Sequence, residues 1–155
     1  MIQSIEEIAT WTLNKLDMYS DDALTLVMRT GFAESGFKHL EQLGGGPAVG
    51  FFQVEPATIM DTWDNYIKYR KKLQNTLYSL GFDESDGRLR VMGNIALQVA
   101  FCRLKYRRDR YPIPDTEDLK GQAEYWKRVY NTKLGKGTVK HFMDACKDYE
   151  PCVGV

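Results

Sequence analysis

Two carboxylates near the middle of the chain are the first candidates for chemistry. Glu34 lies near the end of a predicted helix, three residues after Gly31 and seven after Val27, so these residues share one helix face. That face must point inward if the helix is to bury its apolar residues, which carries the Glu34 carboxyl toward the core or a cleft wall. Glu55 follows beyond a glycine-rich stretch. The pair is therefore a candidate for acid–base chemistry.

Burial disfavours the charged form of a carboxyl, and the negative end of the helix dipole acts in the same direction. We therefore predict that the pKa of Glu34 lies above its free value of about 4.3, so that the side chain holds a proton near neutral pH. A protonated carboxyl is what a general acid needs in order to protonate a leaving oxygen. The alternative is an exposed Glu34 in the last helical turn, paired with Arg29 or Lys38.

The stretch "GGGPAVG" at 44–50 lets a ligand's backbone or ring approach closely, because glycine carries no side chain. The rival interpretation, a phosphate-binding loop, is disfavoured because the Gly-Lys-Ser/Thr ending is missing. No Gly-x-Ser-x-Gly occurs, and neither His39 nor His141 has an evident Ser or Cys partner for acyl transfer. Carboxylate chemistry is what remains.

The spacing of the cysteines and histidines gives little support for metal or redox chemistry. The three cysteines form no Cys-x-x-Cys pair, and with two histidines no metal-ligand spacing emerges, so we expect neither a metal nor a cofactor. Cys102, Cys146 and Cys152 are interpreted as reduced thiols. Pairing of Cys146 with Cys152 in an oxidising compartment stays open, since spacing alone does not decide it.

Hydrophobic periodicity predicts a chain of amphipathic helices. The first begins with a Ser4–Glu7 capping box, and the third begins at Pro56 and runs to Gly81, with an interruption near Asp64 as the alternative. The segment 87–108 is apolar over most of its circumference between Val91 and Cys102, which is typical of a central helix enclosed by others. The predicted helices cover 5–17, 20–36, 56–81, 87–108, 117–130 and 138–148.

The helical period fails between Phe37 and Val54, where turn residues predict a small hairpin or paired irregular strands. We therefore expect a mainly α fold of the α+β kind, in which residues 1–155 form one helical domain with one small β-hairpin beside a cleft. At 155 residues, a single domain can bury most of its apolar surface. The three tryptophans, Trp11, Trp63 and Trp126, are predicted to lie in the core, although one could stack on a sugar ring.

Charge and hydropathy exclude several classes of protein. Lys plus Arg and Asp plus Glu both number 21, so no net charge would draw the chain to nucleic acid or to an anionic membrane. The basic run "KYRRDR" at 105–110 is interpreted as a solvated face. The N-terminus lacks the pattern of a signal peptide, and no window is apolar enough to span a bilayer. We expect a monomer made in the cytoplasm, without nucleic-acid or stable membrane partners.

Four segments occur in the order "AESGF" (33–37), "VGFFQVEPAT" (49–58), "NIALQVAFCRL" (94–104) and "RVYN" (128–131). Together they resemble the soluble lytic transglycosylase and goose-type lysozyme branch of the lysozyme superfamily. The resemblance implies a lysozyme-like fold with Glu34 as the catalytic acid and Glu55 as a base that orients water. The substrate-binding residues that it implies are Ser35, Gly50, Phe51, Phe52, Gln53, Tyr130 and Asn131. From the residues alone, Glu55 could equally cap a helix and Tyr130 could belong to the core.

The resemblance also implies a function. The expected activity is cleavage of the β-1,4 bond between N-acetylmuramic acid and N-acetylglucosamine in peptidoglycan strands, by inverting hydrolysis or, alternatively, as a lytic transglycosylase that forms 1,6-anhydro ends. A phage source is expected, either an endolysin that reaches the periplasm with a partner's help or an enzyme carried in a virion. The competing interpretations are a glycan-binding or virion structural protein without activity, and a nucleic-acid module that uses the basic run.

Overall fold

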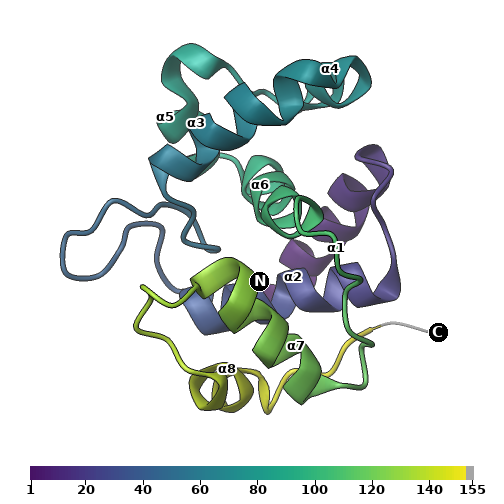
Figure 1. The fold of residues 1–155 in the computed structure, drawn as a ribbon, viewed down its shortest axis with the longest axis vertical. Coiled ribbons are helices and arrows are strands. Elements are labelled where there is room, and N and C mark those ends of the chain that lie inside the picture. The colour runs from purple at the N-terminus through teal and green to yellow at the C-terminus, as the bar shows by residue number, and fades with distance from the viewer. Residues whose placement is uncertain (153–155) are drawn as a thin grey trace.

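The computed structural model describes residues 1–152, and the chain there is mainly helical, as the periodicity predicts (Figure 1). Irregular loops join the helices. The α-helices are α1 (Ile2–Lys15), α2 (Asp21–Glu34), α3 (Pro56–Asn65), α4 (Lys71–Ser79), α5 (Gly87–Met92), α6 (Ile95–Arg107), α7 (Leu119–Tyr125) and α8 (Val139–Cys146). The shorter segments are η1 (Ile67–Tyr69), η2 (Glu84–Asp86) and the π-helix η3 (Trp126–Asn131).

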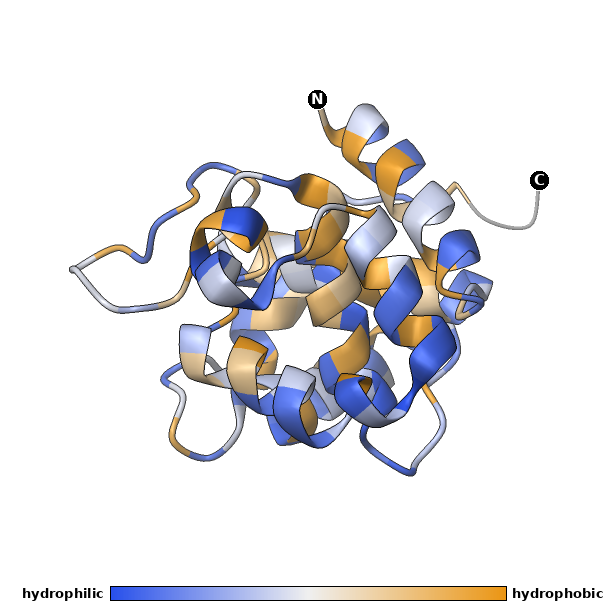
Figure 2. Ribbon diagram, turned by 90° about the horizontal axis from the view of Figure 1, so that it is seen from above, coloured by the Kyte–Doolittle hydropathy of each residue, from blue (hydrophilic) through white to orange (hydrophobic). Residues whose placement is uncertain are grey.

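Helix α6 forms the centre of the fold, where it contacts α1, α2, α3, α5 and η3 (Figure 1). Every residue from Leu97 to Leu104 is buried, including the polar Gln98 and the charged Arg103, because the mostly apolar segment has neighbours on each side. Asn94 caps its start by accepting from the backbone N–H of Leu97 at 3.1 Å. Coloured by hydropathy, the interior between the helices is mostly hydrophobic and the outer faces are largely hydrophilic (Figure 2).

Helix α2 carries Glu34 at its last position, and local sequence signals fix both of its ends. The Ser20 hydroxyl accepts from the backbone N–H of Ala23 at 3.0 Å, and Asp21 and Asp22 complement the positive end of the helix dipole. Ser35 is the C-cap after Glu34, and Gly36 follows with a φ of 62°. The position of Glu34 at a helix terminus therefore follows from the sequence.

Several predicted helix boundaries were wrong. Helix α1 begins at Ile2 without a side-chain cap, so Ser4 lies inside it and the Ser4–Glu7 capping box does not form. The helix predicted over 56–81 breaks after Asn65, close to the alternative break at Asp64, and turns through η1, which buries Ile67 completely. The segment 87–108 is two helices, because Asn94 starts a new one after Gly93.

Residues 37–54 contain no regular strand, so the predicted hairpin is not confirmed as sheet within residues 1–152. Two isolated antiparallel bridges, Glu41 with Val49 and Val49 with Val54, hold this loop together. Positive φ angles interrupt the extended backbone that a ladder needs, at 85° and 84° for the first two glycines of the triplet and 51° for Gln53. The loop projects from the helices on the side of α3 (Figure 1).

Other predictions had mixed outcomes. Trp63 and Trp126 are buried, but Trp11 is 51% exposed, so its assignment to the core was wrong. All three cysteines are free thiols, two of them buried and Cys152 exposed. Among residues 1–152, no helix combines the length and apolar character needed to cross a membrane.

Candidate functional site

A cleft of about 810 Å³ opens where α2 ends, and we refer to it as the Glu34 cleft. Four helical elements besides α2 contribute lining residues, namely α3, α6, η3 and α8, and the loops around 39–55 and 132–137 form the rest. Its lining residues are Ala33, Glu34, His39, Gln42, Leu43, Ala48, Gln53, Glu55, Thr58, Lys105, Trp126, Tyr130, Asn131, Thr132, Leu134, Gly135, Lys136, Gly137 and His141. This volume lies within the roughly 300–1,000 Å³ that is usual for small-ligand sites.

Glu34 is mostly buried in the cleft wall, and burial raises the pKa of its carboxyl from 4.5 to about 7. The positive charge of Lys105 and the indole N–H of Trp126 act in the opposite direction but do not overcome burial. The raised pKa agrees with the expectation from the helical face. Glu34 therefore holds a proton through the acid range up to neutrality while it faces an open cleft.

Lys105 is the cation whose charge lowers the pKa of Glu34. Contacts with η3 fix its position. Its Nζ donates to the backbone carbonyl of Tyr130 at 2.7 Å and lies 4.3 Å from the centre of the Tyr130 ring. Burial lowers the pKa of Lys105, and the carboxylate of Glu34 is the largest charge effect that raises it. No carboxylate lies within 4.0 Å of this amine in the described part of the chain.

Trp126 and His141 close the wall beside Glu34. The indole Nε1 of Trp126 is buried, acts on the Glu34 carboxyl without reaching the geometry of a hydrogen bond, and has no other partner in residues 1–152. His141 Nε2 lies 2.7 Å from the carbonyl oxygen of Ala33, and because a carbonyl only accepts, this nitrogen must carry the hydrogen. A buried N–H without a partner costs free energy. The indole N–H of Trp126 is therefore available to donate to a ligand or to an ionised Glu34.

The π-helix η3 places Trp126 and Tyr130 on the cleft wall. Tyr130 is 2% exposed, donates its hydroxyl hydrogen to the carbonyl of Phe52, and stacks on Tyr106 with the ring centres 5.1 Å apart. Thr132 N–H donates to the carbonyl of Lys127 at 2.8 Å, a bond across five residues that is typical of π geometry. Tyr130 thus ties η3 both to α6 and to the loop that contains Phe52.

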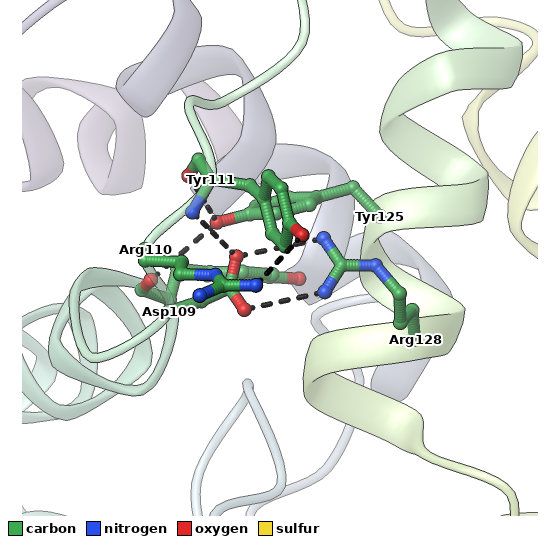
Figure 3. Close-up of polar contacts among 6 residues, drawn as sticks. Asp109, Arg110, Tyr111, Tyr125 and Arg128 are labelled. Carbon is green, nitrogen blue, oxygen red and sulfur yellow. Dashed lines mark hydrogen bonds and ion pairs between the residues drawn. The ribbon is translucent and has the colours of Figure 1, made fainter.

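A polar cluster at the surface secures the start of η3 (Figure 3). Arg128 donates to both carboxylate oxygens of Asp109, at 3.2 and 3.5 Å, and Asp109 also accepts from the backbone N–H of Tyr111 at 3.1 Å. The guanidinium groups of Arg110 and Arg128 each lie 5.1 Å from the Tyr111 ring centre. The cluster therefore links the segment that follows α6 to η3. Arg128 is half exposed, so its ion pair stabilises this link only modestly.

Lys127 stabilises the conformation of the loop at 131–137. Its Nζ donates to Asn131 Oδ1 at 2.6 Å and to the carbonyls of Thr132 and Gly135 at 2.9 and 3.0 Å. A Cβ at Gly137 would lie 3.0 Å from the Asn131 amide nitrogen, so the loop also packs closely on Asn131. Asn131 lines the cleft as predicted from the resemblance, but its side-chain oxygen organises the loop.

Glu55 and Gln53 also line the cleft. Glu55 precedes α3 at the N-cap position, but its side chain makes no capping hydrogen bond, and it is exposed. Gln53 donates from Nε2 to the carbonyl of Gly50 at 2.9 Å. The structure therefore brings Glu34, Glu55, Gln53, Tyr130 and Asn131 together around one cavity.

Four residues implied by the resemblance as substrate contacts do not line the Glu34 cleft, and these predictions need correction. The Ser35 hydroxyl donates to the Phe51 carbonyl at 2.7 Å, and Gly50, with a φ of 81°, packs against the Gln98 side chain. Phe52 is completely buried. Phe51 lines a separate, more apolar hollow with Phe37. Ser35 and Gly50 therefore hold the loop in place, through the Phe51 carbonyl and the Gln98 side chain.

The sequence did not identify Lys105 or His141 as part of the site, and it predicted Trp126 to lie in the core, with stacking on a sugar ring as the alternative for one of the three tryptophans. Lys105 was grouped with a solvated basic run, yet it is half-buried, whereas the neighbouring Arg107 and Arg108 are exposed. The available signal was its helical spacing, since Lys105 follows Phe101 by four residues and Cys102 by three, which places it on a buried face. His141 carried no comparable signal.

No group of three or more metal-binding side chains occurs among residues 1–152. No protein-family model, curated protein or solved structure matches the chain. Any function must therefore be argued from the site.

Proposed function

We propose that the protein is a lysozyme-like glycosidase that cleaves the β-1,4 bond between N-acetylmuramic acid and N-acetylglucosamine in peptidoglycan. The observation that carries the proposal is a mostly buried carboxyl, Glu34, with a pKa of about 7, on the wall of a cleft of about 810 Å³. The order of the "AESGF", "VGFFQVEPAT", "NIALQVAFCRL" and "RVYN" segments supports the same class. The irregular loop at 37–54 would take the place of the small hairpin expected beside the cleft.

In this mechanism Glu34 is the general acid. Its proton passes to the glycosidic oxygen as the bond to the sugar breaks, and the carboxyl becomes a carboxylate. Cleavage by a protonated carboxyl at neutral pH requires a raised pKa, which the burial of Glu34 supplies. The sugar acquires positive charge in the transition state, and in inverting hydrolysis a water molecule attacks it from the face opposite to the leaving group.

Glu55 is the group that distinguishes the two outcomes. A second carboxylate that activates water gives inverting hydrolysis, whereas a lytic transglycosylase uses the substrate's own hydroxyl to form a 1,6-anhydro ring. Glu55 lines the cleft and does not cap α3 through its side chain. This placement favours hydrolysis with Glu55 as base, and transglycosylation is the alternative.

The test is clearing of chloroform-treated Gram-negative cells by the purified protein. Glu34→Gln keeps the shape of the side chain but holds no transferable proton, so we expect clearing to fall at least about a hundredfold. Glu124→Gln, the same change on the exposed surface of α7, is the matched control and should clear cells like the wild type. Equal clearing by Glu34→Gln would remove the assignment of the acid.

Mass spectrometry of the released muropeptides separates the two chemistries. Reducing ends mean that water attacked, and 1,6-anhydro ends mean that the sugar hydroxyl did. If hydrolysis is correct, Glu55→Gln should lose most of its activity. Wild-type anhydro products with an active Glu55→Gln would instead establish the transglycosylase.

A further inference from the structure

Lys105 has no role in the proposed reaction so far, yet it is the most restricted cation of the cleft. A half-buried lysine is costly unless something compensates its charge, and here one donor is committed to the Tyr130 carbonyl at 2.7 Å with the Tyr130 ring 4.3 Å away. These contacts fix the amine at the cleft wall that contains Glu34. The other donors of the ammonium group have no protein acceptor among residues 1–152.

Proton transfer from Glu34 leaves a negative charge that the Lys105 amine could stabilise. When Glu34 gives up its proton, a carboxylate forms in a largely desolvated position, and its charge must be stabilised for the step to be fast. Exposed cations do this poorly because water screens them. A fixed cation behind the acid does it without reorganisation, and it also avoids repelling the positive charge on the sugar if it lies away from the reacting carbon.

We propose that Lys105, held by Tyr130, is a positioning residue that supplies the counter-charge for the Glu34 carboxylate after proton transfer. The inference rests on the proposed function for its kinetic consequence, but its electrostatic part can be tested alone. The unpartnered N–H of Trp126 would act in the same direction as Lys105. The opposing influence on Glu34 is burial.

Other titratable groups also face Glu34 and must be considered in any pH experiment. They come from α6, η3, α8 and the two loops, and they are Cys102, Tyr106, Tyr130, His141, His39, Glu55 and Lys136. Burial raises the pKa of Cys102 to about 12 and raises those of Tyr106 and Tyr130 well above 10, so these three stay neutral near pH 7. Lys105 remains the cation that is both fixed and partly shielded from water.

The decisive measurement is a ¹³C NMR titration of the Glu34 side-chain carboxyl, assigned by its loss in Glu34→Gln. Removing the charge in Lys105→Met should move the midpoint upward by about one pH unit, because an opposite charge nearby favours the ionised acid. Lys105→Gln, which can still donate to Tyr130, should give the same upward shift. Lys105→Arg keeps the charge and should restore most of the wild-type midpoint.

Lys136→Met is the matched control, since it removes a lysine from the exposed rim of the same cleft. Because solvent screens that charge, the midpoint should move by less than about 0.3 pH unit. An unchanged midpoint in both Lys105→Met and Lys105→Gln, each with a native amide spectrum, would overturn the proposal. An equal shift in Lys136→Met would do so as well.

Kinetics complete the test. If Glu34 is the acid, Lys105→Met should lower kcat about tenfold with little change in KM, and the alkaline limb of its pH profile should move upward with the NMR midpoint. A rise in KM at unchanged kcat would instead assign Lys105 to ground-state binding. If the wild type fails to clear cells, the proposed function is lost, but the NMR titration still decides whether Lys105 is coupled to Glu34.

Discussion

At the scale of single residues, the burial that raises the pKa of Glu34 suits it to act as an acid but also destabilises the folded protein above neutral pH. A carboxyl whose pKa is about 7 in the folded protein and 4.5 when unfolded binds its proton more tightly in the folded state. Its contribution to stability is therefore present in full below pH 4.5 and is lost as the pH rises through 7. Above neutrality the folded protein contains a poorly solvated charge.

Replacing Glu34 should reveal this cost. The difference in unfolding free energy between Glu34→Gln and the wild type should grow in favour of the variant by about 3 kcal/mol between pH 4 and pH 8, because glutamine does not ionise. Urea unfolding at the two pH values measures it, with Glu124→Gln as the surface control. A difference that is the same at both pH values would mean that Glu34 is not shielded.

The same proton should determine the pH dependence of catalysis. Because only protonated Glu34 acts as the acid, kcat should fall as the pH rises through about 7, by about tenfold for each further pH unit. Initial rates on purified peptidoglycan between pH 5 and 9 give the profile. An alkaline limb centred near pH 4.5 would show a carboxyl with ordinary proton affinity and would contradict the assignment.

At the scale of elements, α2 depends on a close contact just before the acid. A Cβ on Gly31 would overlap the Phe37 ring, and Phe37 is 1% exposed, so the ring has little room to move. Alanine favours helix by about 1 kcal/mol over glycine, but overpacking a core costs about 1–3 kcal/mol. The second effect is expected to prevail here, because the overlap involves most of the ring edge.

We therefore expect Gly31→Ala to lower the free energy of unfolding by about 1–2 kcal/mol. Gly93→Ala is the control, since its Cβ would come no closer than 3.4 Å to Leu89. Denaturant unfolding of both variants, and of Gly31→Ala combined with Phe37→Leu, measures the effect. If the smaller leucine does not offset part of the loss, the contact with Phe37 is not its cause.

The loop at 131–137 makes a second prediction for an element. Lys127→Met removes three donor contacts, so the loop should open more often and the amide of Gly135, which donates to the Thr132 carbonyl, should exchange its hydrogen at least about tenfold faster. Hydrogen exchange followed by NMR tests this. Lys133→Met, at an exposed neighbouring position, should leave the exchange rate unchanged.

Much of the helical framework could be predicted, because its signals are local. Ser20 and Pro56 mark the starts of their helices through the adjacent residues, whereas the separate start of α6 at Asn94 was not predicted. Glu34 and its raised pKa followed from helical spacing. Helical spacing alone also puts Lys105 on a buried face, but its acceptor could not be predicted, because the Tyr130 carbonyl is 25 residues away. The irregular loop at 37–54 also depended on tertiary contacts, including the one between Gly50 and Gln98.

At the scale of the whole molecule, 21 basic and 21 acidic residues leave no net charge. Long-range attraction to an anionic cell wall should therefore be weak, and binding should depend on contacts within the cleft. For the inactive Glu34→Gln variant, we expect the Kd for purified sacculi to change less than about threefold between 20 and 200 mM salt. A sedimentation assay measures this, and a steep loss of binding with salt would indicate a basic surface that governs association.

The π-helix at 126–131 determines which side chains can form this wall of the cleft when the length of the segment changes. A π turn holds about one residue more than an α turn, so it behaves as a single-residue insertion in an otherwise α-helical segment. Deleting one residue there would restore α geometry and rotate everything after it by about 100° around the axis. Tyr130 would turn away from Phe52 and Lys105 would lose its acceptor. Homologues in which this segment is one residue shorter would have to build that wall from different side chains.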